Sequence, residues 1–127
     1  MLGMTENESE KQLLELEDYA RMALDEASEA LGSDIALLDL RGISQFADFF
    51  VIASGETARH IESMADDVVR ALRNNGLRVH HREGTGAGGW VLLDFPGVVV
   101  HFFSRSAREF YGLEQLWARA PEIVRVQ

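Results

Sequence analysis

The stretch 90–103, WVLLDFPGVVVHFF, decides the fold of this chain. Two runs of aliphatic and aromatic residues flank Pro96 and Gly97, a pair that favours a tight turn. The sequence therefore predicts two antiparallel strands, over 90–95 and 98–103. With a turn of two or four residues, strand parity gives this hairpin two faces of different composition. The mixed face carries Trp90, Leu92, Asp94, Val99, His101 and Phe103, and the apolar face carries Val91, Leu93, Phe95, Val98, Val100 and Phe102.

The two faces predict different surroundings. The apolar face must be covered by helices, because its side chains cannot form hydrogen bonds with water and their exposure is unfavourable. On the mixed face, the Asp94 carboxyl and the His101 imidazole would both need polar partners if they were buried. We therefore expect the mixed face to be open. Aromatic anchors beside a few polar groups are typical of a protein docking surface.

The rest of the chain predicts a complete α/β domain. Apolar spacing predicts one helix over 9–31, closed by Gly32, and a second from Gly55-Glu56-Thr57 to about Asn75, closed by Gly76. Residues 34–40, 49–54 and 77–81 read as strands. Residues 106–117 read as a short helix that packs Phe110, Leu113 and Trp117 on one side, and the Gly-rich segment 84–89 is interpreted as a mobile loop.

These elements assemble into one predicted architecture. The strand at 49–54, the second helix and the strand at 77–81 form a βαβ unit, so the two strands should be parallel with a right-handed crossover. The expected fold class is α/β, with a mixed five-stranded sheet, two long helices and one short helix. The sheet combines the βαβ unit with the C-terminal antiparallel hairpin. We expect a flexible acidic lead-in at 1–8, a single domain at 9–120 and a C-terminal tail at 121–127.

Composition narrows the classes of function. The chain of 127 residues has a net charge of −9 and no cysteine, which excludes disulfides, thiolate catalysis and Cys-based metal sites. Residues 1–40 hold 11 acidic and 2 basic side chains, whereas residues 41–127 hold 10 of each. No basic stripe is present to neutralise phosphates, so direct nucleic-acid binding is not expected. No apolar run is long enough to cross a bilayer and no signal-peptide order is visible, which makes the cytoplasm the expected location.

The sequence has few features that indicate a catalytic site. The adjacent His80 and His81 point to opposite faces of a strand, and neither His60 nor His101 has a ligand partner at metal-binding spacing. The Gly-rich segment lacks the Gly-Lys-Ser/Thr ending of a P-loop and leads into a strand. No serine lies in a Gly-x-Ser-x-Gly setting. We therefore expect no metal, no cofactor and no catalytic residue.

Several separated motifs resemble the ribosomal silencing factor family, also called RsfS or Iojap-type. The resemblance covers about Leu13 to Trp117. It leaves the acidic stretch before Leu13 without a counterpart, and the loop at 86–89 is richer in glycine than is usual in the family. It is carried by Asp39, the segment 47–55 (ADFFVIASG), Arg59-His60, Glu83-Gly84, the segment 90–94 (WVLLD), the segment 99–101 (VVH) and the segment 108–117 (REFYGLEQLW).

This resemblance implies a nucleotidyltransferase-like fold without nucleotidyl transfer. It implies binding to a basic ribosomal protein on the intersubunit face of the large subunit, the fourteenth in bacterial naming. Such binding would block joining of the small subunit and repress translation when nutrients are short. The carboxylate pattern of active nucleotidyltransferases, Asp-x-Asp on one strand, is missing, and Ser54-Gly55 inverts their Gly-Ser turn.

Carried over position by position, the resemblance predicts a set of partner-binding residues. Among them, Trp90 is expected as an anchor, Asp94 and Glu114 as partners of basic groups, and Arg108 as an organiser of the short helix. Internal ion pairs are the alternative for Asp48 and Arg108. The predicted set is Asp48, Trp90, Asp94, His101, Arg108, Tyr111, Glu114 and Trp117.

Two further hypotheses stay open at this point. One is a degenerate nucleotidyl- or phosphoryl-transfer enzyme that uses Asp39 and Asp94 with magnesium. The other is a homodimer away from the ribosome, because an exposed face with Trp90 and Phe103 is able to pair two copies of the chain.

Overall fold

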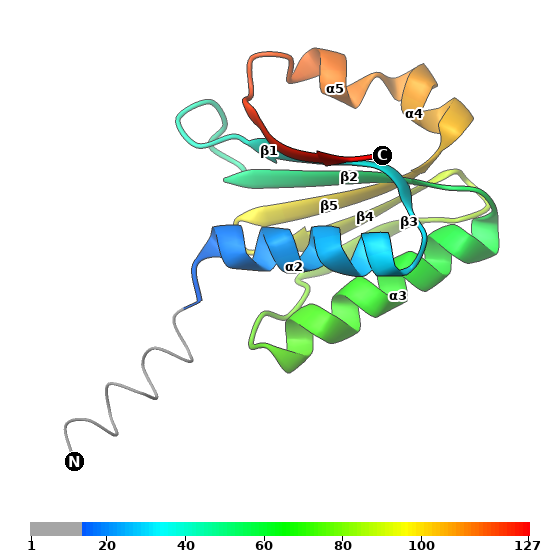
Figure 1. The fold of residues 1–127 in the computed structure, drawn as a ribbon, viewed down its shortest axis with the longest axis horizontal. Helices are drawn as coiled ribbons and strands as arrows, with labels where there is room; N and C mark the ends of the chain where they lie inside the picture. Colours follow the sequence, from blue (N-terminus) through cyan, green and yellow to red (C-terminus); the bar gives the residue numbers. More distant parts are fainter. Residues whose placement is uncertain (1–13) are drawn as a thin grey trace.

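A mixed six-stranded sheet organises the computed structural model, which describes residues 14–127. Two long helices cover one face of the sheet and two short helices lie on the other (Figure 1). The strand order is β3-β4-β5-β2-β1-β6, and only β2 and β5 are parallel neighbours within this sheet. The elements are α2 (Leu16–Glu29), β1 (Ser33–Asp39), β2 (Phe49–Gly55), α3 (Ala58–Asn74), β3 (His81–Thr85), β4 (Trp90–Phe95), β5 (Val98–Ser104), α4 (Arg105–Tyr111), α5 (Leu113–Leu116) and β6 (Glu122–Val126).

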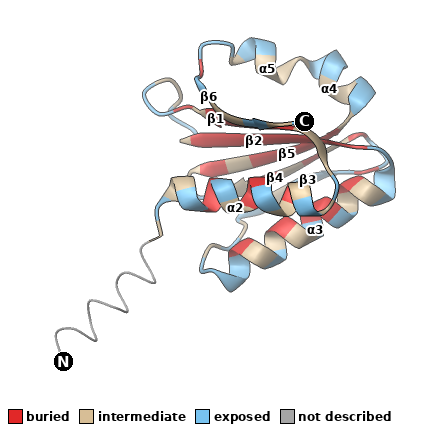
Figure 2. Ribbon diagram, viewed as in Figure 1, coloured by how far each residue is buried: buried red, intermediate tan, exposed pale blue. Residues whose placement is uncertain are grey.

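The α/β class and the hairpin are confirmed. Phe95 pairs with Val98, so the turn consists of two residues, Pro96 and Gly97, and the predicted parity holds along both strands. The apolar face of the hairpin lies beneath α2 and α3 and joins the main core (Figure 2). On α3, one stripe of apolar residues at helical spacing is fully buried against the sheet: Ile61, Met64, Ala65, Val68 and Leu72.

The expected count of five strands is wrong. Residues Glu122–Val126, predicted as part of a C-terminal tail, form β6 and pair antiparallel with β1 at the edge of the sheet. The strand predicted over 77–81 is displaced: β3 begins at His81 and includes Gly84 and Thr85, so the Gly-rich segment is a hairpin turn between β3 and β4. As predicted, β2 and β3 run in the same direction, but β5 and β4 lie between them.

The C-terminus of α2 differs from the prediction by one residue. Leu31, not Gly32, adopts the left-handed conformation, with φ of 65°. Its amide donates to Ser28, and the Gly32 amide donates to the Ala27 carbonyl at 2.8 Å. A Cβ on Gly32 would lie 2.9 Å from that carbonyl oxygen, so glycine is needed here for close packing. The predicted start of this helix at Ser9, and the lead-in before it, lie outside the described residues.

The short helix predicted over 106–117 is broken in two. Gly112 adopts φ of 57°, which ends α4 and lets α5 start in a new direction. Leu113 and Trp117 still pack on the second face of the sheet, as predicted. Phe110 was expected to pack with them, but it precedes the break, faces solvent and is 81% exposed.

Candidate docking surface

The mixed face of the hairpin is covered only in part. Over β1, β2 and β5, the α4–α5 segment buries a second apolar cluster that includes Phe50, Ile52 and Phe103. Over β3 and β4 no helix of the described chain lies on this side (Figure 1). Cross-strand pairing places side chains of all three strands on this uncovered part, and six of these residues make up what we call the open face. They are His81 and Glu83 of β3, Trp90, Leu92 and Asp94 of β4, and Val99 of β5.

Trp90 stands where the open face meets the short helices. Its half-buried ring lies 4.6 Å from the ring of Tyr111, at the end of α4, and 4.9 Å from that of Phe103 beneath it. The indole Nε1 donates a hydrogen bond to His101 Nδ1 at 3.2 Å. Because the indole N–H is satisfied inside the protein, the remaining exposed part of the ring is apolar and suited to contact with a partner.

The structure places His101 below this surface. The side chain is 3% exposed, and burial lowers the pKa of His101 to about 3, so the ring is neutral at ordinary pH. With Nδ1 accepting from Trp90, the ring proton lies on Nε2, which has no hydrogen-bond partner in the described structure. An open mixed face was predicted because this histidine would need a partner, and the indole of Trp90 supplies that partner while His101 stays buried.

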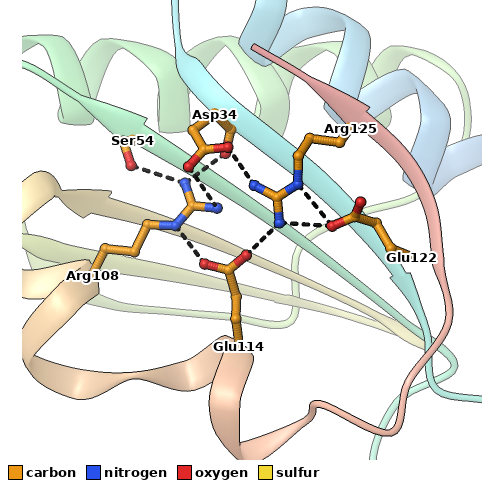
Figure 3. A network of polar contacts seen from close by, with 6 residues as sticks. All are labelled: Asp34, Ser54, Arg108, Glu114, Glu122 and Arg125. Atoms are coloured by element: carbon orange, nitrogen blue, oxygen red, sulfur yellow. Dashed lines mark hydrogen bonds and ion pairs between the residues drawn. The ribbon is translucent and has the colours of Figure 1, made fainter.

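Arg108 and Glu114 belong to an internal network of charges (Figure 3). Only 9% of the Arg108 side chain is exposed. Its Nη1 donates to the carbonyl of Asp34 at 2.6 Å and to Oγ of Ser54 at 2.9 Å, and its Nε donates to Glu114 at 2.8 Å. Arg108 therefore has the internal ion pair that was the alternative to partner contact, and its bonds join α4 to α5, β1 and β2.

Arg125 of β6 completes the network. Its guanidinium pairs with Glu114 and Glu122, at 2.7 Å each, and with the Asp34 carboxylate. Desolvation raises the pKa of Glu114, but hydrogen bonds from Arg108 and Arg125 outweigh it, so the net pKa lies below the usual value. Hydrogen bonds to Glu122 and Glu114 raise the pKa of Arg125. Both groups are thus charged throughout the physiological range.

The other predicted residues lie nearer to solvent. Asp94 is half-buried on the open face, and its carboxylate has no ion pair among the described residues. Asp48 precedes β2 and lines a hollow of about 420 Å³ with Glu17, Asp18 and Arg41. Trp117 follows α5 and packs edge-on against Phe50 at 5.6 Å. Of the eight predicted residues, the structure thus brings Trp90, Tyr111 and Asp94 to one open surface.

Four residues of the open face were not among the predicted partner-binding residues: His81, Glu83, Leu92 and Val99. Strand parity had already put Leu92 and Val99 on the mixed face, and that signal alone was sufficient to find them. Glu83 is exposed and bonded to His81 at 2.7 Å. A pocket of about 570 Å³ adjoins the face at Tyr111, between the turn at 86–89 and Phe110. Residues of the β3–β4 turn line this pocket. Because the sequence did not predict that turn, it did not predict the pocket.

The geometry disfavours two-metal chemistry. Asp39 on β1 and Asp94 on β4 are three strand spacings apart, about 14 Å at ~4.8 Å per spacing. Metal ions in two-metal sites lie about 4 Å apart and share carboxylates. Asp39 is instead paired with Arg41 at 2.8 Å, and this hydrogen bond lowers the pKa of Asp39. No cluster of three or more His, Cys, Asp or Glu side chains able to hold a metal occurs in residues 14–127.

Comparison with known proteins identifies close relatives. Residues 13–127 match the family described as "Ribosomal silencing factor during starvation". A ribosomal silencing factor RsfS of Bacillus subtilis is 40% identical over 88 residues, which is 69% of this chain and 75% of the relative. A Mus musculus protein named "Mitochondrial assembly of ribosomal large subunit protein 1" is 32% identical over 66% of this chain and 38% of its own length. A crystal structure of a Chromobacterium violaceum protein superimposes with a TM-score of 0.79 at 28% identity, over 83% of this chain and 88% of that chain. None of the described helices is long and apolar enough to span a membrane.

Proposed function

The chain belongs to the ribosomal silencing factor family, and we propose that it docks through its open face on a basic protein of the large ribosomal subunit. The fourteenth large-subunit protein, on the intersubunit side, is the partner that the family resemblance implies. Docking there blocks joining of the small subunit by steric exclusion and represses translation when nutrients are short. The proposal includes a cytoplasmic site of action, a nucleotidyltransferase-like scaffold and no enzymatic step.

The open face is the observation that carries this proposal. Its centre is the half-buried Trp90 with the exposed Tyr111 beside it, and aromatic side chains of this kind dominate binding energy at interfaces. Leu92 and Val99 extend the apolar area, and Glu83 and Asp94 supply negative charge. An apolar centre beside carboxylates is complementary to a basic protein surface.

The charge of the chain supports a protein partner over RNA. A net charge of −9 is repelled by ribosomal phosphates, and the chain has a single lysine, in its first 13 residues. Approach to an RNA-rich particle is then favourable only where a basic protein is exposed, and complementary charge there speeds the encounter. We therefore expect binding to weaken as salt concentration rises.

Co-sedimentation with isolated large and small subunits tests the proposal. We expect the wild-type chain to pellet with the large subunit only, and Trp90→Ala and Asp94→Lys to lose most of this binding. Asp67→Lys is the matched control, because it makes the same charge change on α3, on the opposite face of the sheet. Each variant is first checked for native circular dichroism and cooperative unfolding.

The control decides what a loss of binding means. If Asp67→Lys weakens binding as much as Asp94→Lys, net charge and not the open face governs docking. If folded Trp90→Ala binds as well as wild type, the anchor is elsewhere. Failure of the wild-type chain to pellet with either subunit would refute the proposal. The alternative, a transferase that binds nucleotide with magnesium, would then be tested by titration calorimetry.

A homodimer remains part of the proposal, since the same apolar centre can pair with a second copy when no ribosome is present. Sedimentation velocity over a concentration series would detect it. We expect Leu92→Glu to abolish self-association, and a monomeric wild type at the highest concentration would rule it out.

A further inference from the structure

Neither short helix is held on the sheet by a fully buried apolar side chain. All residues of α4 and α5 are at least partly exposed, and only Ala107 and Leu113 of the two helices join the second apolar cluster. Tyr111, which flanks Trp90 on the docking side, is carried by this weakly packed segment. Something other than apolar burial must therefore fix where Tyr111 stands.

The charge network supplies that attachment (Figure 3). Arg108 ties α4 to β1 and β2 through the Asp34 carbonyl and the Ser54 hydroxyl, and Glu114 ties α5 to Arg108. Arg125 then joins Glu114 to β6 and to Asp34. These contacts link residues up to 91 positions apart in the sequence. Because Arg108 is almost completely buried, its bonds are weakly screened by water and salt.

We propose that Arg125 and Asp34 are positioning residues for docking: through Glu114 and Arg108 they hold α4–α5 closed on the sheet and so keep Tyr111 against Trp90. This inference rests on the proposed function. Neither residue belongs to the open face, since Asp34 lies on β1 and Arg125 on β6, at the opposite edge of the sheet from β3 and β4. An effect of either residue on docking has to pass through α4–α5.

The fraction of molecules in which α4–α5 is closed determines the apparent affinity for the partner. A partner that needs the closed arrangement binds with an apparent Kd equal to the intrinsic Kd divided by the closed fraction. Weakening the network therefore changes affinity little while the segment stays mostly closed. Affinity falls about tenfold when only about a tenth of the molecules are closed. Local opening and binding are linked in this way without an adjustable parameter.

Two variants loosen the network from its remote side. Arg125→Met keeps an apolar stem and removes the charge, and Arg125→Met combined with Asp34→Asn removes two members. Arg82→Met is the matched control. Arg82 is 30% exposed against 29% for Arg125, and it pairs with two carboxylates, those of Glu62 and Asp66, where Arg125 pairs with three. It joins β3 to α3 and contacts no part of the network.

Hydrogen exchange of the free protein measures the closed fraction. We expect amides of residues 105–116 to exchange about tenfold faster in Arg125→Met and faster still in the double variant, with core strands unchanged. Arg82→Met should leave these amides as in wild type. Arg125→Lys, which keeps the charge, should restore part of the protection.

Affinity for the large subunit is then measured on the same proteins. The inference requires the apparent Kd to rise by the reciprocal of the closed fraction found by exchange. Unchanged exchange in both network variants would overturn it, as would a mostly open segment with wild-type affinity, or lost affinity with unchanged exchange. If the wild-type chain does not bind the subunit, the proposed function fails, while exchange still decides whether the network holds α4–α5.

Discussion

The buried imidazole of His101 should make the stability of this protein fall in weak acid. In the unfolded chain a histidine has a pKa of about 6.5, whereas burial lowers the pKa of His101 to about 3 in the folded state. At pH values between about 3 and 6.5, the imidazole of His101 binds a proton in the unfolded state but not in the folded state. Unfolding therefore takes up a proton, and the free energy of unfolding decreases as pH falls below about 6.5.

The size of the effect follows from the two pKa values. Relative to pH 8, the lost stability is about 2 kcal/mol at pH 5, and it approaches ~5 kcal/mol near pH 3, where the folded state also takes up the proton. Carboxylates titrate in the lower part of this range, so the window from pH 5 to 8 separates imidazole titration from theirs, and comparison with a variant at position 101 separates His101 from the other three histidines. A loss of 2 kcal/mol is a large share of the 5–15 kcal/mol that is typical of a domain of this size.

Urea unfolding followed by tryptophan fluorescence at pH 5, 6, 7 and 8 measures the effect. The comparison is with His101→Asn, which keeps an oxygen to accept the Trp90 N–H but does not titrate. We expect the wild-type free energy to drop by about 2 kcal/mol between pH 8 and pH 5 relative to the variant. A wild-type-minus-variant difference that is constant over this window would refute the inference that the imidazole is buried and neutral.

Three further predictions concern stability and are checked by thermal or urea unfolding. Leu31→Gly should stabilise the protein by about 1 kcal/mol, because an 82% exposed leucine holds a left-handed conformation there; equal or lower stability would contradict this. Gly86→Ala should lower the free energy of unfolding by about 1–3 kcal/mol, since its Cβ would lie 2.1 Å from the Ala58 carbonyl oxygen. An unfolding midpoint equal to that of wild type would show that the turn packs less closely against Ala58. Phe102→Ala should cost about 3–5 kcal/mol and Phe110→Ala less than about 0.5 kcal/mol, because the first ring is buried and the second is 81% exposed; similar losses in both would contradict the exposure of Phe110.

Local patterns predicted the parts of the fold that local physics determines. The two faces of the hairpin followed from the period of two and from the Pro96-Gly97 turn, and both agree with the register of Phe95 with Val98. The buried stripe of α3 followed from helical spacing. In each case the signal lies within about 15 residues of sequence, and no distant partner is needed to interpret it.

What the sequence did not predict depends on distant partners. The β6 segment EIVRV is a strand because β1 offers it a free edge, and its five residues alone are too short to indicate one. The burial of His101 depends on the helices that cover it and on the Trp90 N–H. The bond from Arg108 to the Asp34 carbonyl spans 74 residues, so no spacing rule reveals that Arg108 turns inward.

The parallel pairing of β2 with β5 has a consequence for the order of folding. Phe49 and Val98 are direct partners although α3, β3 and β4 separate them in the chain, and Leu37 of β1 meets Val124 of β6 near the end of the sequence. Contacts between such distant segments slow folding, because loop-closure entropy must be overcome before they form. During synthesis the β4–β5 hairpin can form early, but the outer edge of β1 stays uncovered until β6 (Glu122–Val126) has been added.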